Sequence, residues 1–545
     1  MPYFNFTQEI GEPDLVTEEI PGIESEASFF LSTSAAEGLR SSRVADITGE
    51  SSSSESFKSN YAKLPDYLKA CLDYSAIVCW RSYRVEIGKL VRLLLAEGLI
   101  EDRPGDIMED VAANVLKELI DLGMLQEEEQ GTEVRVPASY LRLCILKLEK
   151  QDFVSKTANS PVRLGIRDDG REIYPNVEGL LIQSLFIFGV YRRHYSIDSY
   201  RGLSRAYMRN VCGMHFLLVL DLDGRIERLP DELGDLIHLR YLGLVWSYLD
   251  ELPGTLGNLK RLQTLDIRRC GELRKLPIQI LHIQQLRHLL MSHCVNDGEI
   301  RVPKGIGTLV NLRTLSGIYG GDDIAMELIA LTQLRELGVK RVSADHASEL
   351  FAAIKKMENL TSLSLEAEEN YFHSSVNLSI FPELDAFSPP PLLQEFFLRG
   401  GLIEMPVWFA SMENLTRLSL IDSYLSDNPT SALQLLPKLK HLKLWKAYKA
   451  RHIGKEFCNA GGFPVLETLT IASNFLAEWT EIETGAFPRL RYLCFHCENL
   501  IFLPEGLQNI STLQDLRFFQ WHPDLRRRLM GEENYKIKHV PNISS

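Results

Sequence analysis

Apolar residues recur along most of the chain in the phrase Leu-x-x-Leu-x-Leu, in which Phe, Ile, Met or Val can replace leucine at the later places. Consecutive phrases start 22 to 33 residues apart, and a period of about 20 to 29 residues is typical of a leucine-rich repeat. Each repeat supplies one strand, whose leucines point inward while the residues between them point outward. The pattern therefore predicts an α/β fold, a leucine-rich-repeat solenoid with a curved parallel sheet in the form of a horseshoe. The thirteen starts are Leu217, Leu239, Leu262, Leu286, Leu312, Leu334, Leu360, Leu393, Leu415, Leu439, Leu466, Leu490 and Leu513.

Several turns depart from this pattern. Gly317 takes the third apolar place of the Leu312 phrase, and Ile182 begins a degenerate first turn. The longest interval contains three prolines, Pro389, Pro390 and Pro391, which predicts a loop that bulges from the solenoid. Eight residues after a phrase start, we expect a small polar side chain that bonds neighbouring backbone. The residues at that place include Ser247, Cys270, Cys294, Ser423 and Asn474.

A helical segment precedes the repeats. Its apolar residues recur every third or fourth position in three stretches, which predicts three amphipathic helices. The last helix ends at Gly123, a favourable C-terminal cap, and two short strands are predicted around Gly131. A further short helix is predicted near Tyr140 to Leu148, so the segment has the make-up of a winged helix. The three stripes are Leu64, Leu68 and Leu72, then Ile87, Val91 and Leu95, then Met108, Val111, Val115 and Leu119.

The chain thus divides into four predicted parts. Residues 1–58 contain four consecutive serines, acids and no sustained apolar period, which predicts a disordered Ser-rich acidic tail. Residues 59–155 form the winged-helix-like domain, and residues 156–210 a connector with the degenerate first repeat. Residues 211–540 form the leucine-rich-repeat domain.

The net charge of -14 argues against a dedicated nucleic-acid binder, which needs a concentrated basic face. The third predicted helix is itself acidic, with Glu109, Asp110, Glu118 and Asp121, so contact with a nucleic-acid groove would be repelled. We expect no membrane span, no secretory signal and a cytoplasmic location, because no apolar run is long enough and the nine cysteines are scattered. The Asn-x-Thr matches at Asn359 and Asn414 are interpreted as parts of a repeated phrase and not as glycan acceptors.

No motif for catalysis, cofactor or metal binding emerges. The phosphate-binding phrase G-x-x-x-x-G-K-[ST] is absent, and the Gly-Lys pair at Gly88 lies inside an amphipathic helix. Cys494 and Cys497 have the spacing of half a zinc site, but they lie on a repeat strand with no second Cys/His pair nearby. No local context marks a nucleophile. We therefore expect no enzymatic activity, no cofactor and no metal.

The outward strand positions of the second half are the best candidates for function, because packing does not dictate them. Arg, Trp and Tyr are favoured anchors of protein interfaces, so the concave face is a candidate protein-binding surface. The alternative is a solvated face with incidental charges. The candidate residues are Lys340, Arg399, Arg417, His441, Lys443, Trp445, Tyr492, His496 and Phe519.

Residues 61–77, 90–102 and 109–126 resemble the winged helix of plant coiled-coil NLR disease-resistance proteins. As in that family, repeats follow that contain LPDELGDLIHLRYLGL at 229–244 and LPGTLGNLKRLQTLDI at 252–267. The resemblance covers about residues 60–540. It implies recognition of pathogen effectors, or of guarded host proteins, by the repeats, with a nucleotide-binding module that switches between ADP and ATP.

The sequence departs from the family pattern in ways that agree with one another. The coiled-coil region and the nucleotide-binding core are not found, and VCWR at 78–81 stands where the family has an FPED-like turn. The family's Met-His-Asp motif, whose His reads the ADP phosphate, aligns with Val136, Pro137 and Ala138. The sequence therefore predicts a truncated NLR without its own nucleotide switch, whose winged helix packs against the first repeats and shields that end of the leucine core.

The predicted function is innate immunity, through binding of an effector, a guarded host protein or another NLR. A general leucine-rich-repeat scaffold or adaptor and a non-functional NLR relic are the alternatives. The winged-helix phrases favour the first function over a general scaffold. We expect a monomer, because oligomerisation in the family depends largely on the nucleotide-binding module.

Overall fold

The computed structural model describes residues 57, 59–82, 84–128, 131–138, 140–141, 162–168, 181–189, 203–224, 226–291, 300–321, 323–368, 380–384, 387–426, 428–519 and 521–544. Nearly all of the predicted tail, the predicted turn residue Cys294 and most of the predicted helix at 140–148 lie outside these ranges. So do residues 369–379, within the interval for which a bulging loop is predicted.

Within the described residues of the N-terminal domain, three named helices and a small antiparallel sheet follow a helical stretch at residues 59–63. The helices are α4 (Asp66–Ser82), α5 (Ile87–Glu97) and α6 (Met108–Asp121), which confirms the three predicted helices. The predicted stripe of α6 is only partly correct, because its buried residues are Ala112, Leu116 and Leu119. The strands are β1 (Val85–Glu86), β2 (Gln126–Glu127) and β3 (Glu133–Arg135), in the order β1-β3-β2. The sequence predicted the β2–β3 hairpin, which we call the wing, but not the two-residue strand β1.

Glycine ends two segments of this domain as expected. Gly123 follows α6 with a φ of 69°, and Gly131 lies in the wing turn with a φ of 66°. This left-handed backbone costs other residues more than it costs glycine, which has no Cβ. The chain can therefore reverse sharply at both places.

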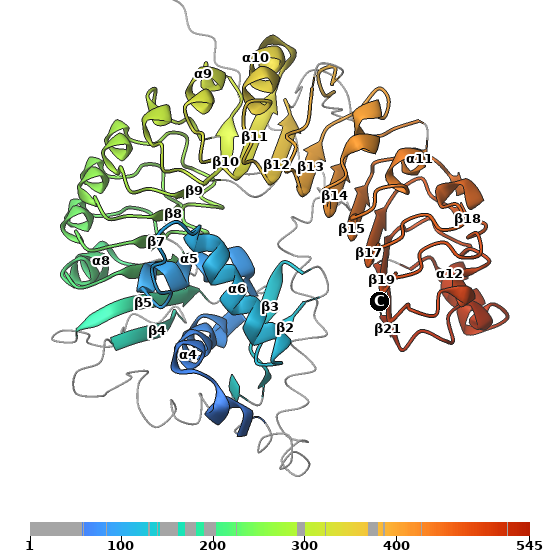
Figure 1. Cartoon of the computed structure of the whole chain (residues 1–545), viewed down its shortest axis with the longest axis horizontal. Coiled ribbons are helices and arrows are strands. Elements are labelled where there is room, and N and C mark those ends of the chain that lie inside the picture. The colour runs from blue at the N-terminus through green and yellow to red at the C-terminus, as the bar shows by residue number, and fades with distance from the viewer. Residues whose placement is uncertain are drawn as a thin grey trace, which may run out of the picture. The chain divides into compact units, whose positions relative to one another are not determined.

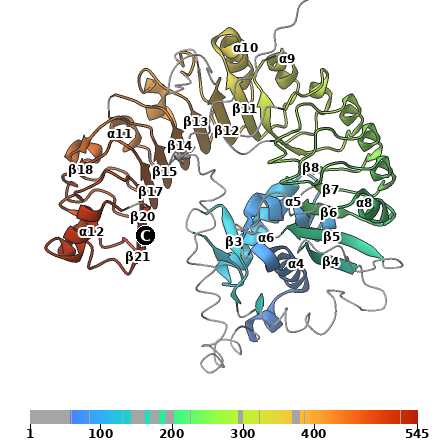
Figure 2. The same cartoon turned by 180° about the vertical axis from the view of Figure 1, so that it is seen from behind.

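The repeats form one parallel sheet of sixteen strands, in which sequence neighbours pair throughout. Figures 1 and 2 show helices and turns on the outer side of this sheet and the N-terminal domain on its inner side. We call the latter side the inner face. The strands are β4 (Val162–Asp168), β5 (Ile182–Gly189), β6 (Val219–Asp223), β7 (Tyr241–Gly243), β8 (Thr264–Asp266), β9 (His288–Leu290), β10 (Thr314–Tyr319), β11 (Glu336–Val342), β12 (Ser362–Ala367), β13 (Glu395–Arg399), β14 (Arg417–Ile421), β15 (His441–Trp445), β17 (Thr468–Ala472), β19 (Tyr492–His496), β20 (Asp515–Phe519) and β21 (Asn542–Ser544).

Every one of the thirteen predicted phrases precedes its strand by two residues, from Leu217 before β6 to Leu513 before β20. The degenerate turn at Ile182 is also confirmed, because β5 pairs in parallel with β6. Strands β4 and β21 extend the sheet beyond the recognisable phrases. A separate two-stranded sheet joins β16 (His452–Ile453) to β18 (Glu478–Trp479).

The returns on the outer side are short. Most are 3-10 turns that follow a proline or a glycine, and they alternate with a few α-helices. The helices are α8 (Arg205–Cys212), α9 (Ile324–Ile329), α10 (Ala344–Ile354), α11 (Thr430–Leu433) and α12 (Pro523–Met530). The 3-10 turns are η2 (Asp231–Asp235), η3 (Gly254–Asn258), η4 (Ile278–His282), η5 (Ile306–Thr308), η6 (Val407–Ser411), η7 (Lys455–Phe457), η8 (Leu507–Asn509) and η9 (Asn534–Lys536).

The inward leucines build one continuous apolar cluster from Ile182 to Val540. Asparagines of the repeated phrase tie successive turns together: Asn359 donates to the carbonyl of Thr332 at 3.0 Å, and Asn414 to that of Pro391 at 3.0 Å. Each side-chain amide satisfies a backbone acceptor that the turn leaves open. Both asparagines thus take the same place in successive turns, as expected of parts of a repeated phrase.

The prediction of a small polar side chain that bonds backbone eight residues after each phrase start is confirmed in part. Ser247 donates to the carbonyl of Gly224 at 3.3 Å and Cys270 to that of Leu244 at 3.1 Å, as expected. Ser423 is fully buried, but its hydroxyl has no hydrogen-bond partner among the described residues. The prediction for Asn474 is wrong, since Ser473, one residue earlier, caps this turn by accepting from the backbone N–H groups of residues 475 and 476.

The irregular Leu312 phrase becomes a bulge. Gly317 has a φ of 77°, and the pairing of β10 with β11 shifts between Leu315 and Ile318. The extra residue turns Ile318 into the leucine ladder, where it is fully buried. Glycine is suited to this place because a bulged residue often takes left-handed backbone.

Candidate protein-binding face

The N-terminal domain covers the inner face of the first repeats. Phe186, Val219 and Tyr241 point from β5, β6 and β7 into the core of the helical domain and are completely buried there. The ring of Tyr74 in α4 meets that of Phe186 edge-on, with centroids 5.9 Å apart. This apolar cluster is separate from the leucine ladder. The expected packing against the first repeats is confirmed, but the domain rests on the strand face and does not shield the end of the leucine core.

Buried charges join the two domains at β1 and α5. Arg268 donates to the buried carboxylate of Asp266 through Nε at 2.8 Å and Nη2 at 2.7 Å. Its Nη1 reaches Glu86 of β1 at 2.7 Å. Burial works against the ionised carboxylate, yet the adjacent Arg268 lowers the pKa of Asp266. Lys89 of α5 lies 2.7 Å from Asp221 of β6 and forms a second ion pair between the two domains.

Five repeats place an arginine immediately after the first leucine of the phrase, and in four of them this arginine contacts the helical domain. Arg240 donates to the carbonyl of Ala96 near the C-terminal end of α5, at 3.4 Å. The next three meet the acidic first turn of α6. Arg287 and Arg313 lie 2.8 and 3.5 Å from Glu109, and Arg335 lies 2.7 Å from Asp110. We call these four residues the arginine column.

Glu109 stays ionised in this setting. Burial by itself would raise its pKa, but His288, Arg287 and Arg313 around the carboxylate lower it to about 2. His288 is instead held neutral, because burial lowers its pKa to about 4. The two side chains lie 3.2 Å apart but are not aligned for a hydrogen bond, so we attribute the acidity of Glu109 to the two arginines.

Three histidines on this face predict acid sensitivity. Burial lowers the pKa of His288 to about 4 and those of His441 and His496 to about 3. The unfolded chain binds protons at these sites near pH 6.5 and the folded chain does not, so stability is complete above that pH and falls below it. We expect the urea midpoint of unfolding to decrease from pH 6.5 to pH 4. Glu109 titrates below this window.

The variant His441→Gln is expected to flatten this pH profile, whereas His282→Gln, at an exposed site on the outer side, is expected to leave it unchanged. The measurement is a series of urea titrations between pH 4 and pH 8. Equal slopes for wild type and His441→Gln would contradict the assignment of the proton-linked loss to His441.

The part of the inner face from β13 to β20 carries eight of the nine candidate residues. The first, third and fifth residues of these strands point to the inner face, and the leucines between them point into the ladder. Arg417, His441 and Tyr492 are first residues, Lys443 is a third residue, and Arg399, Trp445, His496 and Phe519 are fifth residues. The sequence therefore placed these eight side chains on the correct face.

Three of these side chains form a row of rings in contact with one another. His496 lies parallel to Phe519, with centroids 4.2 Å apart, and its other side meets Trp445 at 4.8 Å. Trp445 and His496 are two strands apart, but Ala472 lies between them and is small enough to let the rings meet. Lys443 places its ammonium 5.2 Å from the centre of the Trp445 ring. We call Lys443, Trp445, His496 and Phe519 the aromatic cluster.

The remaining candidates are engaged with other side chains. Arg417 pairs with Glu395 at 3.4 Å and Arg399 with Asp422 at 3.2 Å. His441 shares a hydrogen bond of 2.9 Å with Thr468. Burial raises the pKa of Tyr492.

Lys340 differs from the other candidates. Its side chain is only 8% exposed, and its ammonium lies 3.8 Å from Glu366. The strand shifts register between Val339 and Val342, which takes Lys340 out of the regular alternation. The prediction of Lys340 as a surface anchor is therefore wrong.

Cys494 and Cys497 belong to the strand and the turn of one repeat. Cys497 occupies a turn position and donates to the carbonyl of Ile471 at 3.5 Å, while Phe495 between them is buried in the ladder. Burial raises the pKa of both thiols to about 12, so neither is a reactive thiolate. The described residues contain no group of three or more side chains arranged to hold a metal ion.

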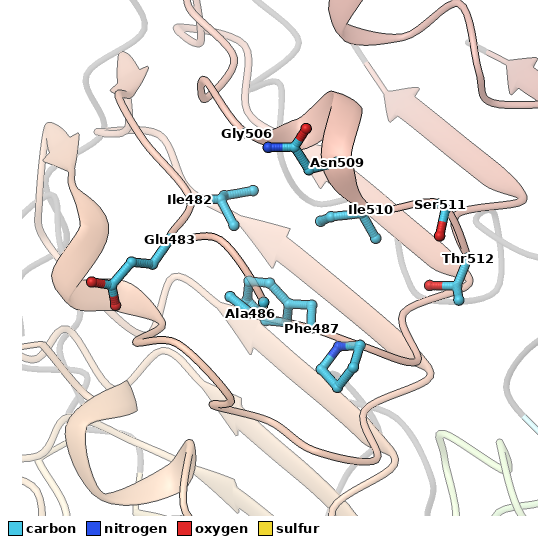
Figure 3. Close-up of a pocket in the computed structure, with 11 residues that line it drawn as sticks. Ile482, Glu483, Ala486, Phe487, Gly506, Asn509, Ile510, Ser511 and Thr512 are labelled. Carbon is cyan, nitrogen blue, oxygen red and sulfur yellow. The ribbon is translucent and has the colours of Figure 1, made fainter.

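A small pocket lies between residues 482–488 and 506–512, with Glu483, Ser511 and Thr512 at its rim (Figure 3). Its volume of about 90 Å³ is well below the roughly 300 Å³ of a typical small-molecule site. Among the residues that the structure places, no helix has the length and apolar character to cross a membrane.

Comparisons with known proteins agree with this architecture. A family model described as a leucine-rich repeat region matches residues 203–542, and one described as a disease resistance protein winged helix domain matches residues 81–139. The disease resistance protein At1g58400 of Arabidopsis thaliana is 30% identical over 521 residues, which cover 89% of this chain and 54% of that protein. Disease resistance protein RPP8 of the same plant is 31% identical over 337 residues, which cover 60% of this chain and 36% of that protein.

The chain thus spans about half the length of At1g58400. Among solved structures, a leucine-rich-repeat protein of Leptospira interrogans aligns with a TM-score of 0.44 and 20% identity, over 70% of this chain and 94% of that one.

Proposed function

Because the chain belongs to the leucine-rich-repeat disease-resistance proteins with a winged helix, we propose that it acts in plant immunity by binding proteins through its inner face. The aromatic cluster is the observation that carries this proposal. Its rings come from three strands of a hydrogen-bonded sheet, so little conformational freedom is lost when a partner binds. The proposed partner is a pathogen effector, a host protein that effectors modify, or another receptor of this family.

The composition of the open face supports a protein ligand. Tryptophan and arginine are over-represented among residues that dominate protein interfaces, and Trp445, Arg399 and Arg417 all lie on this face. Lys443 over Trp445 adds a charged group at the border of an apolar patch. Such a mixed surface suits a protein partner better than a small molecule, which usually needs a pocket that encloses most of it.

The proposed activity is binding inside the cell and not catalysis, and it does not depend on a nucleotide. The candidate residues lie on β13–β20, and none belongs to a phosphate-binding phrase. Addition of ADP or ATP is therefore expected to leave partner binding unchanged.

The test is proximity labelling in plant leaf cells with the full chain and a face variant, in which Arg417, His441, Lys443, Trp445 and Tyr492 are all alanine. The matched control changes five exposed residues elsewhere to alanine: Arg261, His282, Lys356, Tyr248 and Phe475. Wild type and control are expected to label the same defence-related proteins, and the face variant is expected to lose them. All three proteins must first show equal solubility and circular dichroism. Identical partner sets for all three, or empty sets, would refute the proposed surface.

A further inference from the structure

The repeat that contains β15 is basic from its strand onwards. Residues 441–455 contain four lysines, one arginine and no acid, in a chain whose net charge is -14. Three of these cations, Lys446, Lys449 and Arg451, lie between β15 of the main sheet and β16 of the separate two-stranded sheet. Figure 1 shows β18, the strand that pairs with β16, away from the inner face. The three cations therefore follow the edge of the solenoid at the carboxyl ends of the strands.

Aromatic side chains border these cations on both sides. The ammonium of Lys449 lies 5.9 Å from the centre of the Tyr424 ring, in the turn of the preceding repeat. Phe475 lies in the turn of the following repeat and is 45% exposed. That turn is hydrogen-bonded to the basic segment at both of its ends. We call Lys446, Lys449, Arg451, Tyr424 and Phe475 the edge patch.

The backbone at Lys446 does not account for a lysine there. Its φ is 49°, in the left-handed region, which costs glycine least. The same place in three other repeats takes this backbone too, with φ values of 64° at Trp246, 62° at Arg269 and 52° at Asp422. The turn thus requires left-handed backbone but not a lysine side chain, which points to a role for the side chain itself.

The charges around the edge patch define a direction. Among the residues that the structure describes, none of the three cations forms an ion pair. The repeats on either side carry acids, Asp422 paired with Arg399 at 3.2 Å and Glu478 paired with His452 at 3.2 Å. A polyanion that runs along the solenoid would pass from the cations to these acids. A segment that crosses the edge along the line of β15 meets only cations.

We propose that the edge patch binds an acidic segment of a partner protein, next to an apolar side chain of the same partner that rests on the aromatic cluster. This inference rests on the proposed function and adds the chemistry and the direction of the partner. The two surfaces are continuous, because Trp445 of the aromatic cluster directly precedes Lys446. Carboxylates form charge-assisted hydrogen bonds with lysine and arginine, and the bordering rings cover the apolar part of the segment.

The test measures binding of a fluorescent peptide, three repeats of Glu-Phe-Glu-Ser, to the full chain by fluorescence polarisation. An edge variant with three reversed charges is expected to bind at least about tenfold more weakly than wild type, because like charges then meet. Its substitutions are Lys446→Glu, Lys449→Glu and Arg451→Glu. The matched control makes the same change of charge at three exposed cations elsewhere and is expected to bind like wild type. Its substitutions are Lys63→Glu, Lys304→Glu and Arg526→Glu.

Two further variants separate binding from folding. Lys446→Gly removes the side chain and relieves the left-handed backbone, so the urea midpoint of unfolding is expected not to fall. Its peptide binding is expected to weaken by about threefold, the size of one partly exposed ion pair. A variant without charge reversal, Lys446→Gln, Lys449→Gln and Arg451→Gln, is expected to bind weakly as well, even if the edge variant folds poorly. A peptide with glutamine in place of glutamate is expected to bind wild type as weakly as the edge variant binds the acidic peptide.

Equal peptide binding by wild type and the edge variant, or no binding by either, would overturn the inference. Vesicles that contain phosphatidylserine and a single-stranded thymidine oligonucleotide are the other probes. Tighter binding of either probe than of the peptide, lost in the edge variant, would assign the edge patch to a membrane or a nucleic acid and would also overturn the inference.

Proximity labelling with the same variants distinguishes this inference from the proposed function. Labelling that is lost in the face variant but kept in the edge variant leaves the proposed function intact and contradicts the acidic segment. Labelling that is lost in both and kept in the control supports both. If wild type labels no partner although the peptide binds as expected, the proposed function fails and the edge patch stands as a site for acidic segments.

Discussion

Replacing Arg268 by methionine is expected to lower the free energy of unfolding by about 3–5 kcal/mol, because the change removes one partner of a buried ion pair. Asp266 is fully buried, and Arg268 supplies two hydrogen bonds to its carboxylate. Glu86 of β1 loses its contact with the same guanidinium. The remaining negative charge has to be protonated or hydrated, and either outcome loosens the contact between the two domains.

The measurement is the urea midpoint of unfolding with its slope, at pH 7. The double variant Asp266→Asn/Arg268→Met is expected to recover most of the loss, since a buried pair can often be replaced by neutral groups at little cost. Arg269→Met is the matched control: Arg269 is the next residue, is only half-buried and stacks on Trp246 at 4.2 Å, so its loss should cost about 1 kcal/mol or less. Equal losses for Arg268→Met and Arg269→Met would show that the buried pair is not what stabilises this region.

Replacing Trp479 by alanine is expected to cost about 3–5 kcal/mol, as large-to-small changes of buried aromatic residues do. Trp479 is 1% exposed and is the largest of the fully buried side chains. Its ring contacts those of Phe457, Phe487 and Phe495, with centroids 5.0, 6.4 and 6.3 Å away. Alanine would leave a cavity that these rigid rings cannot fill.

The damage should stay local, because a repeat contacts mainly its neighbours. Hydrogen exchange is expected to accelerate in β17, β19 and β20 and to remain slow in β6–β8. Trp521→Ala is the control: Trp521 also packs on a phenylalanine of the repeats, Phe518 at 4.2 Å, but it is partly exposed, so a smaller effect is expected. Exchange that rises equally along the whole sheet after Trp479→Ala would contradict the local character of the core.

The repeats could be predicted in detail because a local period determines them. Each of the thirteen strands β6–β15, β17, β19 and β20 begins two residues after the first leucine of its phrase, and the same pattern identified the weak turn at Ile182. Strands β4 and β21 were missed because no complete phrase marks them. The turn role of Ser473 was missed because Ser473 lies seven residues after the phrase start Leu466, one fewer than the eight residues expected.

The contact between the two domains could not be predicted from periodicity. It joins residues far apart in the chain, such as Glu109 and Arg287, and each side has an ordinary explanation when taken alone. The acids of α6 were interpreted only as evidence against nucleic-acid binding. A signal was present in the repeats, since five turns carry arginine directly after the first leucine, but the partners of four of these arginines are visible only in three dimensions.

For the candidate face, the sequence predicts only which side chains point away from the leucine core. Strand alternation identified which side chains point outward, yet not which of them are buried by a neighbour or engaged in ion pairs. Lys340 illustrates the limit, because a local register shift and Glu366 together remove it from the surface. The contact of the His496 ring with that of Trp445 depends on a small residue, Ala472, in the strand between them.

The contacts of the arginine column depend on the spacing of the repeats. Its members are spaced by whole turns, and each one meets a fixed point of the helical domain, from Ala96 to Asp110. Gain or loss of a turn between Arg240 and Arg335 would move these arginines away from their partners on α5 and α6. A turn gained or lost after β20 would leave all four of these contacts unchanged. The contacts of α5 and α6 therefore fix the number of turns under the helical domain, whereas these contacts do not fix the number of turns towards the C-terminal end.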